Sequence, residues 1–251
     1  MGGAVRPRGA LVLAYHDVGD DPARTNFYTV TPRQLRDELD SIASWGFQFV
    51  DLSDLVDALD AQAPSIDGLV AVTFDDSLVG VHRHAAPLLA ELGVPGTVFA
   101  VSDELGEPPS WWAGSDRLMT KTELRECVAG GMRLGSHTRT HRSLPALNDR
   151  ELTQELTRSR VTLSELAGTP VDLLAYPRGH VDARTAEAAR CSGYRAAFGF
   201  RAGRVLGTTN LFRLPRLPRR SGYRRARLAY EVARPADSWV DPTADVTDSA
   251  P

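Results

Sequence analysis

The chain has 251 residues, of which 42% are hydrophobic and 24% are charged, and its formal net charge is −3. This length and composition fit one large α/β domain with a sizeable buried core. No apolar run approaches the roughly 18 residues of a membrane span, and a chain of negative charge has no overall field that attracts nucleic acid. We therefore expect no membrane span and no nucleic-acid partner.

The N-terminal region has no recognisable export signal. Its apolar run at 10–14 is short and leads directly into Tyr-His-Asp at 15–17, a candidate active-site motif that signal cleavage would remove. We therefore expect a cytoplasmic protein. The two cysteines, Cys127 and Cys191, are too few and too far apart for a disulfide framework or a cysteine zinc site, so we expect both to be small core residues.

Strand and helix patterns alternate along the chain. Short apolar runs rich in branched side chains predict strands, and apolar residues at helical spacing predict helices. The predicted strands are 11–14, 47–50, 69–74, 97–101, 132–135, 171–176 and 194–198. The predicted helices are 32–46, 53–59, 84–92, 120–130, 148–167 and 182–191, and a loop rich in Pro, Gly and Trp covers 103–119.

Three of the predicted helices begin with capping residues. Thr31 is predicted to cap the helix that begins at Pro32, and Ser53 is predicted to cap the next one. Thr120 and Glu123 have the spacing of a capping box before the helix that ends near 130. These signals fix where the three helices start.

About seven alternations of strand and helix indicate a parallel sheet wrapped by helices. A closed barrel and an open doubly wound sheet both fit this pattern. No glycine-rich phosphate-binding motif follows a predicted strand, which argues against a nucleotide-binding open sheet. Reactive residue types instead follow the carboxyl ends of different strands, as in barrel enzymes, so a barrel is favoured. These are His16, Asp75, Asp76, His137 and the turn at 177–179.

Two pairs of potential metal ligands follow predicted strands. Asp75 and Asp76 are adjacent carboxylates, which are costly at a partly buried strand end unless a cation neutralises one of them. Taken alone, this pair could equally be a solvated turn with a helix cap. His137 and His141 are four residues apart, a spacing that on a helical turn points both imidazoles at one ion. Together the pairs offer two nitrogen ligands and one oxygen ligand, the pattern of catalytic zinc sites.

Three segments resemble the motifs of one enzyme family. They are Thr-Phe-Asp-Asp at 73–76, Ser-His-Thr-Arg-Thr-His at 136–141 and Ala-Tyr-Pro-Arg-Gly at 175–179. In order and spacing they are similar to the motifs of the NodB-type polysaccharide deacetylases, carbohydrate esterase family 4. The resemblance covers roughly residues 10–220. It implies an irregular (β/α)7 barrel, the NodB-type deacetylase fold.

The resemblance also implies a metal-dependent N-deacetylase. Asp76, His137 and His141 would bind a divalent metal, most simply Zn²⁺, with Co²⁺, Ni²⁺ or Fe²⁺ as alternatives. The metal would polarise the acetamide carbonyl and lower the pKa of a bound water molecule, whose proton Asp75 would take as general base. The backbone N–H of Arg178 would stabilise the oxyanion.

Two positions depart from the commonest family pattern. No Leu-x-His motif occurs near the C-terminus, where most members carry the general acid. The segment Leu-Ala-Tyr-His-Asp-Val at 13–18 instead resembles the N-terminal motif of poly-N-acetylglucosamine deacetylase-like members, which assigns the acid to His16. A histidine hydrogen-bonded at a strand end is the alternative. Ala175 stands where many members have an arginine that orients the base, and Arg216 is a candidate replacement.

Fewer features support the substrate-binding predictions. Trp111 and Trp112 lie in a loop at the same end of the barrel, where they would stack on a sugar ring or cover the barrel edge. Tyr176 and Pro177, in the third motif, are expected to contact the substrate. Seven arginines at 213–227 form a basic stretch that we expect to be mostly a solvated face, although it would also attract a phosphate-bearing substrate.

The sequence therefore predicts one NodB-like catalytic domain at 10–233, an N-terminal extension at 1–9 and a flexible tail at 234–251. We expect the domain to remove an N-acetyl group from an amino-sugar-containing substrate. A related barrel enzyme acting on a small non-polymeric amide and a non-catalytic metal- or glycan-binding module are the alternatives. The sequence does not indicate an oligomeric state.

Overall fold

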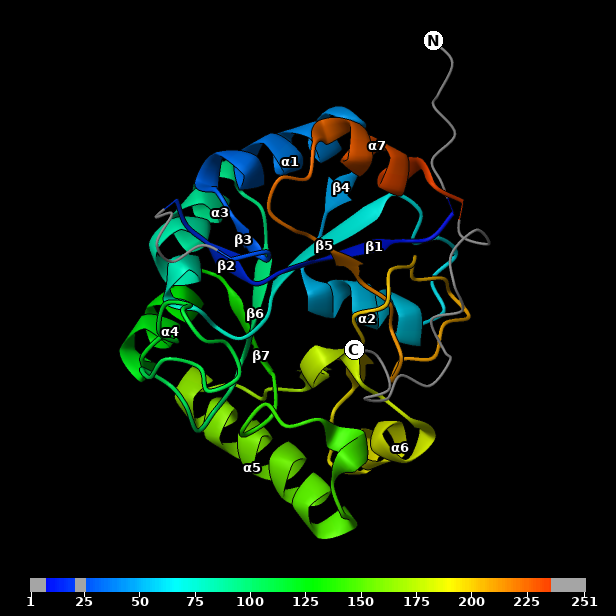
Figure 1. Ribbon diagram of the computed structural model, residues 1–251. Coiled ribbons are helices and arrows are strands. Elements are labelled where there is room, and N and C mark those ends of the chain that lie inside the picture. Colours follow the sequence, from blue (N-terminus) through cyan, green and yellow to red (C-terminus); the bar gives the residue numbers. More distant parts are fainter. Residues whose placement is uncertain (1–7, 21–25, 236–251) are drawn as a thin grey trace.

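The computed structural model describes residues 8–20 and 26–235 (Figure 1). Most of the predicted N-terminal extension and C-terminal tail lies outside these ranges. The strands are β1 (Leu11–Tyr15), β2 (Asp17–Val18), β3 (Thr29–Val30), β4 (Gln48–Phe49), β5 (Leu69–Phe74), β6 (Gly96–Ala100), β7 (Arg133–Ser136), β8 (Leu173–Ala175), β9 (Ala196–Phe198) and β10 (Leu217–Pro218). The α-helices are α1 (Pro32–Ser44), α2 (Leu52–Asp60), α3 (Ala86–Leu92), α4 (Lys121–Ala129), α5 (Asp149–Ala167), α6 (Ala183–Cys191) and α7 (Arg225–Ala233). Shorter helical turns are η1 (Val81–Ala85), η2 (Leu144–Ala146) and η3 (Pro177–Gly179).

The main sheet is parallel and curls on itself. Its strands are hydrogen-bonded in the order β10, β1, β5, β6, β7, β8, β9, and β4 pairs with β5 beside this path. The segment after β9 bridges much of the gap between the two edges, because Leu214 pairs with Phe198 of β9 while Leu217 pairs with Leu13 of β1. Helices surround the sheet (Figure 1), which confirms the predicted α/β barrel in an irregular, incompletely closed form.

The helices begin where capping residues predict, with one exception. Thr31 caps α1 by accepting a backbone N–H at 3.0 Å, and Thr120 and Glu123 form the capping box of α4. The cap of α2 is Asp51, whose carboxylate accepts the N–H of Ser53 at 2.7 Å, so the prediction of Ser53 as cap is wrong. Both residue types cap helices well, and only the backbone conformation shows that Asp51 is the extended residue before the first turn.

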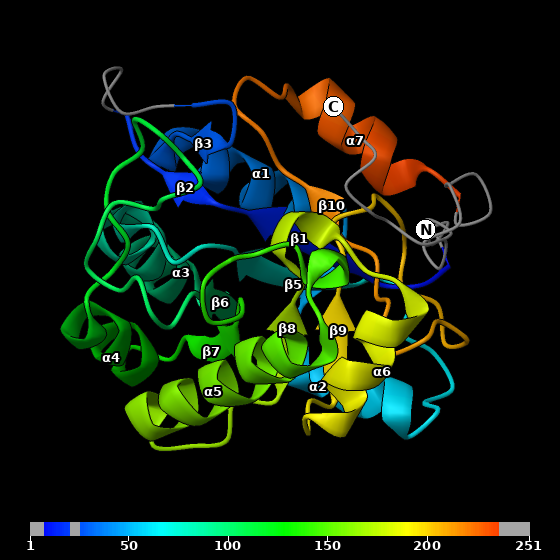
Figure 2. The same cartoon turned by 60° about the horizontal axis from the view of Figure 1, so that its bottom comes forward.

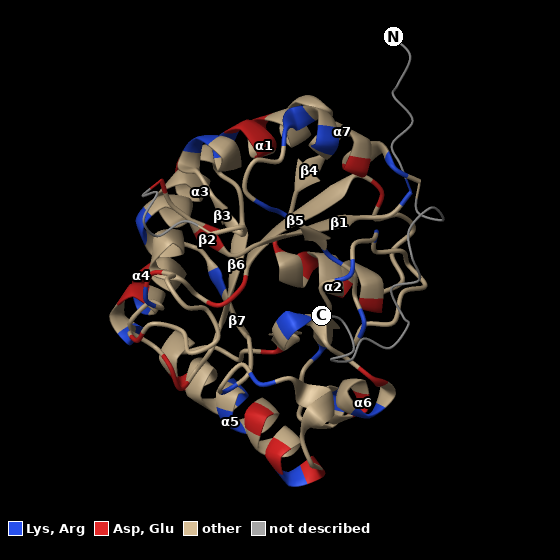
Figure 3. Ribbon diagram, viewed as in Figure 1, with Lys and Arg blue, Asp and Glu red and all other residues tan. Residues whose placement is uncertain are grey.

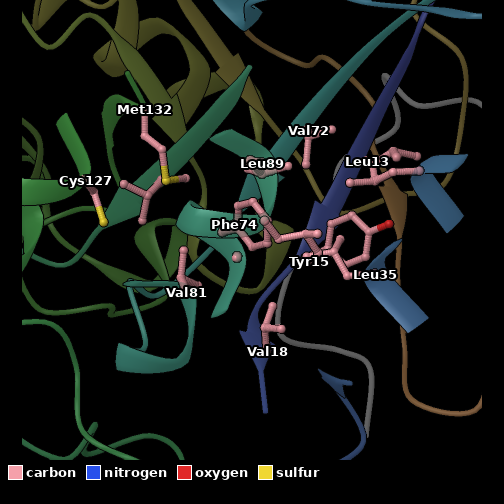
Figure 4. Close-up of a cluster of buried hydrophobic side chains, with 14 of the residues drawn as sticks. Leu13, Tyr15, Val18, Leu35, Val72, Phe74, Val81, Leu89, Cys127 and Met132 are labelled. Atoms are coloured by element: carbon pink, nitrogen blue, oxygen red, sulfur yellow. The ribbon is translucent and has the colours of Figure 1, made fainter. Parts of the chain in front are cut away.

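A large apolar cluster fills the space between the sheet and the helices (Figure 4). Tyr15 and Phe74, the last residues of β1 and β5, stack with ring centroids 5.5 Å apart. Cys127 is buried in this cluster, as predicted. Cys191, the last residue of α6, is exposed, so the prediction that it belongs to the core is wrong; it lies on the outward side of the final turn.

The arginine-rich stretch is only partly a solvated face. It adds β10 to the sheet and forms α7, which packs beside α1 (Figure 2). Arg216 and Arg219 are fully buried, so these two arginines do not belong to a solvated face. Arg219 donates hydrogen bonds to Glu38 of α1 and Glu231 of α7 at 2.7 to 3.0 Å. The burial is tolerated because carboxylates supply the counter-charge.

Charged residues lie mainly on the outer helices and loops, whereas most strand residues are uncharged (Figure 3). None of the helices in the described ranges is both long enough and apolar enough to cross a membrane. Asp75 and Asp76 are exceptions to the surface placement of charge, because both are buried directly after β5. Their position at a strand end makes them candidates for a functional role.

Candidate metal centre and active site

A cavity of about 310 Å³ lies at the carboxyl ends of the parallel strands. Parallel pairing places the residues that follow successive strands at one edge, so segments far apart in the sequence meet here. The predicted site residues that line the cavity are His16, Asp75, Asp76, Trp111, Trp112, His137, His141 and Arg178. They follow β1, β5, β6, β7 and β8.

Asp76, His137 and His141 direct three potential ligand atoms toward one point. Asp76 Oδ1 lies 3.4 Å from His137 Nε2 and 3.3 Å from His141 Nε2, and the three buried side chains have ligand atoms within 4.8 Å of one another. These distances are long for hydrogen bonds, and Asp76 Oδ1 has no hydrogen-bond partner among the described residues. A buried carboxylate oxygen without a partner is costly, so this donor set fits a divalent cation.

Electrostatics favour a positive charge between these side chains. Burial would raise the pKa of Asp76, but the facing histidines lower it, so the carboxylate is ionised. Burial disfavours the charged form of His137, yet the carboxylates of Asp75 and Asp76 raise its pKa above the ordinary value. Burial lowers the pKa of His141 to about 3, which leaves a neutral imidazole.

Contacts around the rings orient the two histidines. His137 Nδ1 lies 2.8 Å from the carbonyl oxygen of Ala175, so Nδ1 is the donor, and in the neutral ring Nε2 carries the lone pair that faces Asp76. Trp111 stacks on the ring of His141, with centroids 4.0 Å apart and an interplanar angle of 19°. Both imidazoles are therefore fixed by groups that are not themselves ligands.

The loop that carries the histidines is not the helical turn that their spacing predicted. Thr138 and His141 have positive φ values of 68° and 57°, and the segment between the two histidines is irregular. Glu155 of α5 holds this loop: its buried carboxylate accepts the backbone N–H groups of Arg139 and Thr140 and the Thr140 hydroxyl, at 2.6 to 3.0 Å. The imidazoles converge, but external hydrogen bonds replace the helical ones.

Asp75 is paired with Arg216 through two parallel hydrogen bonds. Arg216 Nη1 and Nη2 donate to the two carboxylate oxygens at 2.7 and 2.6 Å, and Nε donates to the carbonyl of Gly199 at 2.8 Å. Both side chains are buried. Burial would raise the pKa of Asp75, but the guanidinium holds it below the ordinary value. Asp75 is therefore an ionised carboxylate in a fixed orientation.

His16 lies among aromatic rings. The ring centroids of Tyr28, Phe200 and Trp112 are 4.7, 5.2 and 5.7 Å from that of His16. In the described part of the chain, its buried Nδ1 has no hydrogen-bond partner, so the alternative of a strand-end hydrogen bond through this atom is not observed. Burial lowers the pKa of His16. The ring is held by packing rather than by polar contacts.

The predicted substrate contacts differ in how they face the cavity. One face of Trp111 is covered by His141, so that face is not open to a sugar ring. Tyr176 is fully buried, and its hydroxyl donates to the carbonyl of Phe212 at 3.0 Å. Pro177 is buried too, and neither it nor Tyr176 is among the residues that line the cavity. Motif position alone does not tell which residues of a turn face the site.

Tyr28 and Phe200 line the cavity but were not predicted as site residues, and Gly179, in the predicted turn at 177–179, lines it as well. Phe200 follows β9, so the expectation that site residues follow the carboxyl ends of strands could have identified it. Gly179 has a φ of 72°, and a Cβ at this position would collide with Phe200, so the turn requires glycine. Tyr28 reaches the cavity from the segment before α1, and no sequence pattern marks it.

Comparisons with known proteins agree with this architecture. The sequence profile of the family described as polysaccharide deacetylase matches residues 62–197. A Bacillus subtilis (strain 168) protein assigned to the polysaccharide deacetylases, YxkH, is 20% identical over 212 residues. The match covers 84% of this chain and 72% of YxkH.

Solved structures show the same fold. The deacetylase PplD of Streptococcus pyogenes, in complex with acetate, is 21% identical with a TM-score of 0.77, covering 91% of this chain and all of PplD. IcaB from Ammonifex degensii is 26% identical with a TM-score of 0.77, covering 91% of this chain and 97% of IcaB. Because the family profile spans more than half of the 251 residues, this chain belongs to the polysaccharide deacetylase family.

Proposed function

We propose that the protein is a metal-dependent hydrolase that removes an N-acetyl group from an amino-sugar-containing substrate, giving acetate and a free amine. The observation that carries this proposal is that a three-ligand cluster and an arginine-paired aspartate share one cavity. A cluster without a base beside it would support only binding. Asp75 supplies the additional group that hydrolysis needs.

Asp76, His137 and His141 would hold the metal. Two nitrogen ligands and one oxygen ligand suit Zn²⁺, with Co²⁺, Ni²⁺ or Fe²⁺ as alternatives. When bound, the metal would supply Lewis-acid chemistry to the acetamide carbonyl and lower the pKa of water. The partnerless Oδ1 of Asp76 and the fixed tautomer of His137 support this assignment.

Proton transfer would fall to two other residues. Asp75, held ionised and oriented by Arg216, would accept the proton of the attacking water. His16 would give a proton to the departing amine; burial lowers its pKa, and the nearby carboxylates of Asp76 and Asp75 offset part of that effect. The backbone N–H of Arg178, on the η3 turn beside the cavity, would donate to the oxyanion.

The walls of the cavity support a sugar substrate. Tyr28, Trp112 and Phe200 present apolar ring surface around His16. Aromatic rings pack against the apolar faces of sugar rings, and they also exclude water from the groups that exchange protons. A cavity of about 310 Å³ suits one N-acetylated ring at the reacting position.

Acetate release tests the proposal. Chelator-treated protein, reconstituted separately with each of the four metals, is incubated with N-acetylglucosamine oligomers and with small acetamides. We expect acetate and free amine from the oligomers, and a loss of roughly 100-fold or more in kcat for Asp75→Asn with metal content unchanged. Release from small acetamides alone would favour the small-amide alternative. Metal binding without acetate from either substrate class would overturn the proposal and leave a binding module.

A further inference from the structure

A second cavity, of about 380 Å³, adjoins the candidate active site. Trp111, His141 and Arg178 line both cavities, so the two meet at these residues. The second cavity lies between the tryptophan loop and the segment at 140–147. A substrate whose acetamido group occupies the first cavity can therefore extend into the second.

The hydrogen-bond donors of the second cavity are mainly guanidinium groups. Arg142 and Arg178 line it, and no acidic residue does so within the described ranges. The hydroxyls of Ser110 and Thr140 also line it, but they already donate to glutamates outside the lining. Two cations without an acidic neighbour in the lining are complementary to an anion rather than to a neutral or cationic group.

Of the two arginines that line the second cavity, Arg178 is the one without an ion-pair partner among the described residues. Arg142 is ion-paired with Glu151 at 3.1 Å. Among the residues that the structure describes, none makes a hydrogen bond or ion pair with the side chain of Arg178, which is exposed. An unpaired guanidinium at the junction of two cavities is available for two-point binding of a carboxylate or a phosphate.

The turn that carries Arg178 is held in a fixed and unusual conformation. Arg178 has a φ of 59°, in the left-handed region that non-glycine residues rarely adopt. Gly179 packs so closely on Phe200 that a Cβ would collide with the Phe200 backbone. Position 179 therefore requires glycine, and backbone strain of the kind seen at Arg178 is typically retained at functional sites.

The charges in the first cavity leave this guanidinium uncompensated. Asp75 is already paired with Arg216, and Asp76 belongs to the candidate metal-ligand cluster. We propose that the second cavity binds an anionic group, a carboxylate or a phosphate, of the N-acetylated substrate, with Arg178 as the main contact and Arg142 as the second. This inference rests on the proposed deacetylase function and narrows its substrate class to acidic amino sugars.

Three substrates that differ in charge test the inference. They are the methyl glycoside of N-acetylglucosamine, which is neutral, the methyl glycoside of N-acetylmuramic acid, which adds a carboxylate, and N-acetylglucosamine 1-phosphate. The kcat/KM of each is measured with metal-loaded wild-type protein, Arg178→Gln, Arg178→Lys and Arg142→Gln. Arg158→Gln, at an exposed position of α5 outside both cavities, is the matched control.

We expect wild-type protein to prefer at least one anionic substrate over the neutral one. The preference is measured as kcat/KM for the anionic substrate divided by kcat/KM for the neutral one. In Arg178→Gln this ratio should fall roughly tenfold or more, since hydrogen bonds to charged groups contribute at least about that factor. Arg178→Lys should keep part of the preference, Arg142→Gln should lose less, and Arg158→Gln should not change it. The ratio cancels effects on catalysis that all substrates share.

The outcomes test the anion-binding inference and the proposed deacetylase function separately. A loss confined to the carboxylate or to the phosphate substrate supports the inference and identifies the anion. No preference in the wild type, or an unchanged ratio in Arg178→Gln, overturns the inference, while acetate release from the neutral substrate leaves the proposed function standing. No acetate from any of the three substrates overturns both.

Discussion

Asp75 and Asp76 are consecutive residues with different partners. The backbone turns sharply here, because Asp76 and Ser77 have φ values of 69° and 63°. Asp75 faces the guanidinium of Arg216, whereas Asp76 faces the histidines. Two adjacent buried carboxylates would otherwise repel each other and favour protonation. Separate counter-charges allow both to remain ionised, one as a candidate base and the other as a candidate ligand.

Replacing Arg216 with methionine is expected to leave Asp75 without its counter-charge. An unpaired buried charge costs about 3–5 kcal/mol, so the free energy of unfolding of Arg216→Met should fall by about that amount. Turnover should fall as well, while metal content changes little, because Arg216 is paired with Asp75 and not with the three ligands. Urea unfolding, acetate release and elemental analysis measure the three quantities.

The double variant Arg216→Met/Asp75→Asn separates the two effects. It removes both charges, so most of the lost stability should return while turnover stays low. Normal turnover in Arg216→Met would contradict the proposed role of this arginine in orienting the base.

At the scale of elements, the ends of the strands were predictable from the sequence and the loops between them were not. The predicted strand 69–74 coincides with β5 because its branched apolar run is uninterrupted, and parallel pairing then places the residues after β1, β5 and β7 together. The conformation of the histidine loop depends on hydrogen bonds from α5, which spacing within the loop cannot show. β10 and α7 were missed because arginines interrupt their apolar pattern.

The sequence does contain one indication that α5 contacts another segment through a polar group, namely Glu155. It shares the buried face of α5 with Leu152, Leu156 and Ser159, at helical spacing. A carboxylate on such a face needs hydrogen-bond partners from another element. Here the partners are the backbone and side chain of the histidine loop, so Glu155 connects α5 to the candidate metal ligands.

Removing this connection is expected to weaken metal binding. Glu155→Ala should lower the affinity for Zn²⁺ by roughly 10–100-fold, the usual effect of losing a group that positions metal ligands. Glu155→Gln can still accept the N–H groups through its amide oxygen and should keep most of the affinity. Titration of the metal-free protein with Zn²⁺ against a chromophoric chelator measures both variants. Wild-type affinity in a folded Glu155→Ala protein would show that the loop keeps its conformation unaided.

At the scale of the whole molecule, the barrel is completed by residues close to the end of the described chain. β10 pairs with β1, and Arg219 directly after it joins α1 to α7 through Glu38 and Glu231. Tyr15 of β1 also donates to Glu38, at 2.7 Å. The sequence could not predict this network, because nothing distinguishes Arg219 from its arginine neighbours and Glu38 is 181 residues away.

Arg219 and Arg227 allow the contribution of this network to be measured, since both donate to Glu231. Arg219 is fully buried, whereas the side chain of Arg227 is 56% exposed. Arg219→Met should lower the free energy of unfolding by about 3–5 kcal/mol, because Glu38 and Glu231 lose a buried counter-charge. Arg227→Met should cost at most about 1 kcal/mol, as expected for an exposed ion pair. Urea unfolding of both variants gives the comparison. Equal effects would mean that apolar packing of α7, and not the buried cation, holds α7 against the barrel.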